Sequence, residues 1–178
     1  MSAFDLGKSV GVVVGVLVGI IVCIVVFKLA NKDHAVSTKY DERQKEVRGK
    51  AYTYAFWTTI VSCAALFLLD VSGVNLDILG SVKYFIPVFV GVLVQVTYSI
   101  WNDGYMGINN NSQRYLVIFV AIALFNASIA IRSINEKGVF ENGVMSADMV
   151  NVLCAALLVI VCIEIGIKAL MSKREEEE

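Results

Sequence analysis

Two hydrophilic stretches carry the residues whose chemistry suits binding. One is residues 31–50, and the other is residues 101–111. Arginine side chains in the first could form forked contacts with the carboxylate of Asp103 or with lipid phosphate. We take as the candidate interaction residues Asp41, Glu42, Arg43, Gln44, Arg48, Asn102, Asp103, Tyr105 and Asn109.

The residue types that enzymes and metal sites use are sparse. The single histidine, His34, lies outside the apolar blocks, which excludes a Ser–His pair or a bis-histidine haem within them. No CxxC pair and no glycine-rich phosphate loop is present. The four cysteines all lie inside apolar runs, where thiols usually act as small hydrophobes: Cys23, Cys63, Cys154 and Cys162. We therefore expect no enzyme, no cofactor and no metal.

The composition indicates a membrane protein. Apolar residues make up 57% of the 178 residues and charged residues 17%, whereas soluble domains are less apolar and more charged. The formal net charge is −1, so the charge balance favours no nucleic-acid partner. The lipid bilayer is the expected partner.

Charged residues divide the chain into five apolar blocks. Most have 17 to 19 uncharged residues, and at about 1.5 Å per residue such helices match a hydrocarbon core of roughly 30 Å. Backbone groups in lipid must bond within their own segment, which requires helices. The prediction is an all-α integral membrane bundle of five transmembrane helices, at residues 9–27, 51–69, 84–102, 115–131 and 149 to about 171.

Four regions follow from these blocks. We expect a glycine-zipper transmembrane helix at 1–30, a charged cytoplasmic linker at 31–50, a four-helix transmembrane bundle at 51–172 and an acidic cytoplasmic tail at 173–178. The first apolar run is longer than a signal-peptide core and no clear cleavage site follows it, so we expect it to be retained. Asp41 and Glu42 would suit the first turn of a helix that begins near Tyr40.

The distribution of Lys and Arg predicts the orientation. Eleven of the fifteen lie on the side that holds residues 31–50, and four lie on the other side. Cytoplasmic loops carry the excess of basic residues. The N-terminus is expected outside and the C-terminus inside.

The first apolar block has glycine at every fourth position: Gly7, Gly11, Gly15 and Gly19. This spacing predicts a flat helix face that another helix can approach closely. The partner could be a helix of the same chain or the same helix of a second copy, so a homo-oligomer through the first helix remains open.

Polar groups inside the blocks have two interpretations. Gln95 and Asn126 could line a polar path through the bundle, or could form hydrogen bonds between helices. An acid within a span is a functional hypothesis by default, and this applies to Glu164. However, Lys168 follows it by four residues, in the order that favours an ion pair within the helix. No internal repeat and no broken helix of the transporter type is evident.

Between the last two blocks, Asn142-Gly143 is flanked by apolar pairs, which is a type I′ hairpin signal. An isolated two-stranded hairpin is marginal in water, so we expect only a tight turn here.

The stretches at 41–44 (Asp-Glu-Arg-Gln), 48–52 (Arg-Gly-Lys-Ala-Tyr) and 101–105 (Trp-Asn-Asp-Gly-Tyr) together resemble a group of small uncharacterised multi-span proteins of bacterial membranes. The resemblance covers roughly residues 40–114. It implies a bacterial cytoplasmic membrane and a paired inner-face surface at 41–48 and 102–109.

Two function classes follow. The first is a non-enzymatic membrane scaffold or regulatory protein whose cytoplasmic loops bind a protein partner. The second is a small transporter or channel with a polar path near Gln95 and Asn126. The inner-face residues could also be no more than an anchor, because basic side chains contact anionic headgroups at about 1 kcal/mol each.

Overall fold

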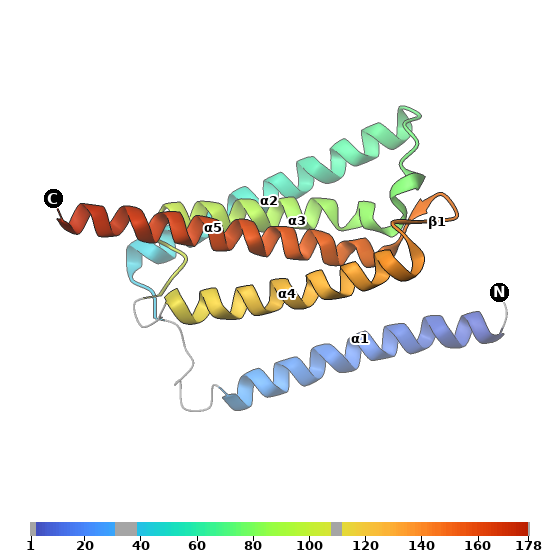
Figure 1. Ribbon diagram of the computed structural model, residues 1–178, viewed down its shortest axis with the longest axis horizontal. Coiled ribbons are helices and arrows are strands. Elements are labelled where there is room, and N and C mark those ends of the chain that lie inside the picture. The colour runs from blue at the N-terminus through green and yellow to red at the C-terminus, as the bar shows by residue number, and fades with distance from the viewer. Residues whose placement is uncertain (1–2, 31–38, 108–111, 178) are drawn as a thin grey trace. The chain divides into compact units, whose positions relative to one another are not determined.

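The computed structural model describes residues 3–30, 39–107 and 112–177. The chain divides into two units, Met1–Lys39 and Tyr40–Glu178, which are described separately. Among its described residues the first unit contains one helix, α1 (Ala3–Ala30), and Figure 1 shows the order of the elements. A Cβ atom built at any of the four glycines of α1 would meet no atom within 4 Å outside its own helix backbone. The partner of this glycine face therefore stays a prediction.

The second unit is a layer of four long helices. They are α2 (Glu42–Val71), α3 (Ile86–Trp101), α4 (Ser112–Lys137) and α5 (Val150–Glu177). The helix α3 packs against α2 and α5, and α5 also packs against α4. The chain is thus mostly helical, as predicted. The start of α2 at Glu42 makes residues 42–50 helical, although we expected them to belong to a linker.

Three helical segments of the described chain are long and apolar enough to cross a membrane: Glu42–Val71, Tyr115–Lys137 and Ala147–Ser172. A fourth span results if the 3₁₀ segment η1 (Asp77–Tyr84) is counted with α3, from which it is bent by 43°. The helix α3 alone has 16 residues, about 24 Å at 1.5 Å each, which is short for a bilayer. The helix expected at 84–102 is present as α3 over residues 86–101. The bent segment η1 ahead of it was not expected; Phe85 lies between the two, and Pro87 lies in the first turn of α3.

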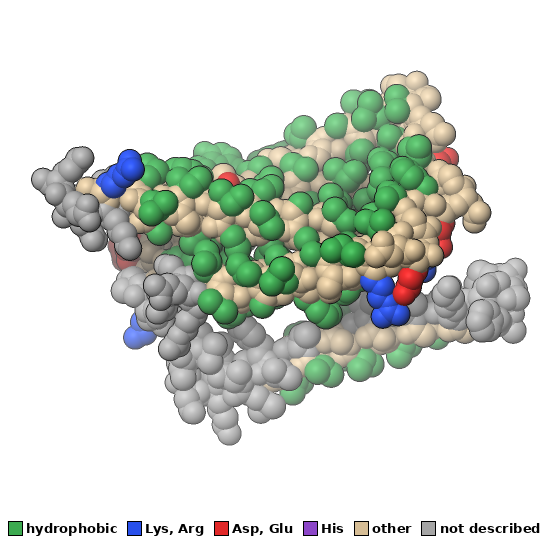
Figure 2. Space-filling view, viewed as in Figure 1, with side chains coloured by type: hydrophobic (Ala, Val, Ile, Leu, Met, Phe, Trp, Pro, Cys, Tyr) green, Lys and Arg blue, Asp and Glu red, His purple; other side chains and the backbone are tan. Residues whose placement is uncertain are grey.

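The outside of this unit is apolar. Figure 2 shows hydrophobic side chains along the helices and charged side chains mainly toward the helix ends. Large residues such as Phe56, Phe67 and Phe125 are more than half exposed. Soluble proteins rarely expose so much contiguous apolar surface, and lipid is the solvent that covers it at no cost. The chain therefore has the surface of a membrane protein.

The interior is small and lies between α3 and α5. Its buried members are Val96 and Ile100 of α3 with Val161 and Ile165 of α5. Close packing of α2 on α3 depends on Gly91, where a side chain would collide with Thr59 and with the carbonyl of Ala55. Small residues at such crossings are what membrane helices use to approach one another.

A hairpin closes one end of the unit. Strands β1 (Phe140–Glu141) and β2 (Val144–Met145) pair antiparallel, and a short 3₁₀ turn, η2 (Ala147–Met149), leads into α5. Asn142 and Gly143 both have positive φ, 52° and 81°, as a type I′ turn requires. The expectation of a turn without strands was wrong, because β2 packs on η1 at Gly80 and gains a tertiary support.

Candidate functional site

The polar site at the opposite end begins with the N-terminal cap of α2. The backbone N–H of Gln44 donates to Asp41 Oδ1 at 2.6 Å, and the backbone N–H of Asp41 donates to Gln44 Oε1 at 3.3 Å. This is a capping box, which satisfies two backbone donors that the helix start leaves free. The box also fixes the side-chain amide of Gln44, so that its NH₂ group points away from the helix.

That NH₂ group holds the loop that follows α3. It donates to the carbonyl of Asp103 at 3.1 Å and to the carbonyl of Met106 at 2.9 Å. The loop folds under α2 closely enough that a Cβ atom on the buried Gly104 would lie 2.5 Å from Val47 Cγ1. A single amide thus joins the start of α2 to the end of α3.

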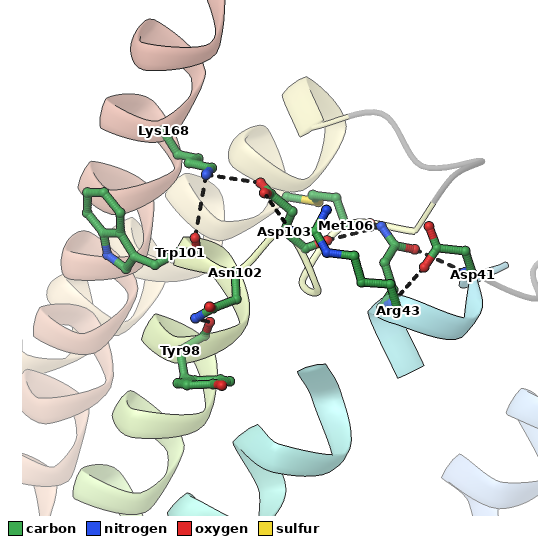
Figure 3. A network of polar contacts seen from close by, with 9 residues as sticks. Asp41, Arg43, Tyr98, Trp101, Asn102, Asp103, Met106 and Lys168 are labelled. Carbon is green, nitrogen blue, oxygen red and sulfur yellow. Dashed lines mark hydrogen bonds and ion pairs between the residues drawn. The ribbon is translucent and has the colours of Figure 1, made fainter. Parts of the chain in front are cut away.

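The carboxylate of Asp103 lies between two cations from different helices. Lys168 Nζ of α5 is 3.1 Å from Oδ1, and Arg43 Nη2 of α2 is 3.8 Å from Oδ2. Figure 3 shows both side chains reaching toward Asp103, with Lys168 also directed at the carbonyl of Trp101, 3.5 Å away. Asp103 itself has a φ of 59°, a conformation that aspartate tolerates better than most residues. We call this set, Asp41, Arg43, Gln44, Asp103 and Lys168, the clasp.

Three residues of the clasp, Gln44, Asp103 and Lys168, line a pocket of about 370 Å³. Its polar lining offers an amide, a carboxylate, an ammonium group and the hydroxyl groups of a tyrosine and a serine. The side chains of Arg43 and Asp103 remain 74% and 55% exposed, so they keep capacity for another contact. The lining residues are Gln44, Ile100, Asp103, Tyr105, Met106, Ile165, Lys168, Ala169 and Ser172. Such a mixture can donate and accept hydrogen bonds and can pack against an apolar group.

Several candidate residues take other positions. Arg48 does not join Asp103: its guanidinium donates to the hydroxyls of Tyr40 and Tyr52, at 3.0 and 3.2 Å. The side-chain amide of Asn102 donates to the carbonyl of Tyr98 in its own helix. Glu42 is exposed in the first turn of α2. Asn109 lies outside the described residues.

Lys168 is the member of the clasp that sequence reasoning assigned wrongly. It was expected to pair with Glu164, but the ion pair that it forms is with Asp103. Glu164 instead accepts a hydrogen bond from Thr97 Oγ1 of α3 at 2.9 Å, and its second oxygen is buried without a partner among the described residues. The sequence held one signal for this pairing: both Lys168 and Asp103 were expected near the inner ends of their helices.

The two residues expected along a polar path lie on α3 and α4, both of which pack on α5. Gln95 of α3 faces a pocket with Arg48 and several tyrosines. The amide of Asn126 in α4 donates to the carbonyl of Ile122 in the same helix. Its hydrogen bond is therefore local, and it links no second helix.

The geometry defines a helical protein with membrane-length apolar helices and a polar clasp where three of these helices end. In comparisons with known proteins, no family model, curated protein or solved structure matches the chain.

Proposed function

We propose that this protein is a non-enzymatic integral membrane scaffold that binds a protein partner at its clasp. The supporting observation is the pocket beside Asp103, where groups from α2, the α3–α4 loop and α5 meet. Its polar members are partly exposed and mix donors with acceptors. A protein segment with its own backbone donors and acceptors matches such a lining, together with an apolar side chain on Ile100 and Ile165.

The proposal includes an arrangement in the membrane. The helix α1 would be a fifth span, with the N-terminus outside and the clasp on the cytoplasmic face of a bacterial cytoplasmic membrane. The excess of Lys and Arg on the clasp side supports this orientation. A reporter fused after Glu178 that is active only inside cells is the expected result, and activity only on the outer face would contradict it.

The test of the partner site fills the pocket without touching the clasp. Ala169 lines the pocket and is exposed, so Ala169→Trp should occupy the space that a partner needs. Ala156 is an exposed alanine on the same helix outside this pocket, and Ala156→Trp is the matched control. Wild type and both variants would be cross-linked in native membranes and purified, and the proteins cross-linked to each would be identified.

The expected result is one partner recovered with wild type and with Ala156→Trp, and lost with Ala169→Trp. Equal recovery of the partner with all three proteins would contradict a partner site in this pocket. The clasp would then serve only to connect the helices.

A small transporter or channel is the second candidate, and the bend of 43° between η1 and α3 favours it. Transporters often place their substrate sites at broken helices. The test is ion flux into liposomes that contain the purified protein. Flux that Gln95→Leu blocks would support this function, and the absence of flux would remove it.

A further inference from the structure

Arg48 lines a second pocket, which shares Tyr105 and Met106 with the pocket at the clasp. The pocket has a volume of about 270 Å³ and lies among α2, α3, α4 and the α3–α4 loop. The carbon at the centre of the Arg48 guanidinium is 4.3 Å from the ring centre of Tyr40 and 5.8 Å from that of Tyr52. We call this the tyrosine pocket, and its lining is Tyr40, Arg48, Tyr52, Gln95, Val96, Tyr105, Met106 and Tyr115.

No carboxylate of the described chain lies within ion-pair distance of Arg48. None of the ion pairs found there includes Arg48, whose hydrogen-bond partners are two phenol groups. Its side chain is half-buried. A partly buried cation without an anion is unfavourable, because it gives up hydration and gains no opposite charge in return. The two tyrosine rings and hydroxyls offset part of this cost, and a bound anion would supply the opposite charge.

The surrounding hydroxyls are arranged to help bind that anion. A phenol oxygen that accepts a hydrogen bond from the guanidinium keeps its own O–H to donate, which applies to Tyr40 and Tyr52. Burial raises the pKa of Tyr105 to about 12, so this third hydroxyl keeps its proton at neutral pH. Phosphate oxygens only accept hydrogen bonds, and a guanidinium fork matches two of them at once.

The position of the pocket along the helices identifies the source of the phosphate. The charged first turns of α2 end at Lys50, and Ala51 begins its apolar part, while α3 ends at Trp101. The pocket is therefore level with the border between apolar and polar surface, where tyrosines gather in membrane proteins and where lipid headgroups lie.

We propose that the tyrosine pocket binds the phosphate of an anionic phospholipid headgroup, with Arg48 as its counter-charge and Tyr40 and Tyr52 as orienting donors. This proposal does not rest on the partner proposed at the clasp, although the two pockets share Tyr105 and Met106. A choline headgroup brings a second cation close to Arg48, so anionic lipids bind more tightly than phosphatidylcholine.

Native mass spectrometry of the full-length protein tests the site, with phosphatidylglycerol and phosphatidylcholine titrated separately and inorganic phosphate added as a competitor. Arg48→Gln should weaken phosphatidylglycerol binding at least tenfold. Arg48→Lys should weaken it less, because an ammonium group keeps the charge and loses the fork. Lys45→Gln is the control, since it removes the same charge from an exposed position of the same helix and should change binding less than twofold.

Three results would overturn the proposal. Equal losses in Arg48→Gln and Lys45→Gln would mean diffuse attraction of lipid to basic residues. Displacement of phosphatidylglycerol by inorganic phosphate at similar concentrations would assign the pocket to the free ion. Circular dichroism and gel filtration show whether Arg48→Gln is folded. If it is not, Arg48→Lys and the double variant Tyr40→Phe/Tyr52→Phe replace it in the test. Unchanged lipid binding in both of these variants would then exclude the site.

Discussion

The two ends of the second unit are built in different ways. At the clasp, the bonds from Gln44 to Asp103 and from Lys168 to Trp101 join residues 59 and 67 positions apart. At the hairpin end, Asp148 accepts from Ser133 at 2.7 Å and lies 3.5 Å from Lys137, over 15 and 11 positions. Side chains from α2, the α3–α4 loop and α5 form the clasp, whereas the hairpin end combines a backbone-paired turn with side-chain contacts between residues close in sequence.

This difference has a functional consequence. At the hairpin end, β1 pairs with β2, and β2 packs on η1. A turn that is stabilised by its own backbone leaves few side chains to contact a ligand. The clasp depends on side chains that are partly exposed and could exchange one polar contact for another. Binding is therefore expected at the clasp end, and structural stabilisation at the hairpin end.

The largest effect is expected at the hairpin end, from Gly80→Ala. Gly80 has φ 51° and ψ −134°, a conformation open essentially to glycine, and a Cβ atom there would lie 2.9 Å from the carbonyl oxygen of Met145. Strain and collision together should lower the free energy of unfolding by about 3 kcal/mol. Unfolding of the protein in detergent micelles measures this. Gly73→Ala, also at positive φ but with open space around it, should cost less.

At the clasp, Gln44→Leu should cost about 2 kcal/mol, because it removes half of the capping box and leaves the carbonyls of Asp103 and Met106 without their donor. Hydrogen exchange should become faster in the loop at residues 103–107. Lys45→Leu changes the next, exposed position and should leave that loop protected. Unchanged exchange with Gln44→Leu would show that the amide is not what holds the loop.

A smaller loss is expected from Asn142→Ala in the type I′ turn. Asparagine tolerates the positive φ of 52° better than alanine, and the difference should be about 1 kcal/mol. Because the contacts of the hairpin end join residues close in sequence, the rate of amide hydrogen exchange should rise only near β1 and β2. A rise that reaches the α3–α4 loop would contradict the independence of the two ends.

The smallest effect is expected from Asp103→Asn. The Asp103 side chain, which both ion pairs share, is 55% exposed, so removing its charge should change the free energy of unfolding by about 0.5 kcal/mol at low salt and by less at high salt. If partner recovery at the clasp falls sharply while stability changes so little, the carboxylate serves binding. A stability loss of several kcal/mol would mean that Asp103 is mainly structural.

Sequence reasoning succeeded where the physical rule is local. Composition and block length predicted apolar helices, and the Asn142-Gly143 pair predicted the turn type. The acidic residues at 41 and 42 indicated a helix start near Tyr40. The bend at Phe85 and the short length of α3 were missed, because a proline in a first helical turn fits a continuing apolar run as well as a new helix.

For the candidate site, the sequence by itself determined that charged residues gather in two stretches between apolar helices, since lipid excludes charge from the segments that cross it. Tertiary structure decided which of these residues meet. Lys168 pairs with Asp103 rather than Glu164, and Arg48 contacts tyrosines rather than Asp103. These choices depend on how the helices are rotated about their axes. Close packing at Gly91 and Gly104 helps to set this for α2 against α3 and its following loop, and the spacing of residues along the chain does not determine it.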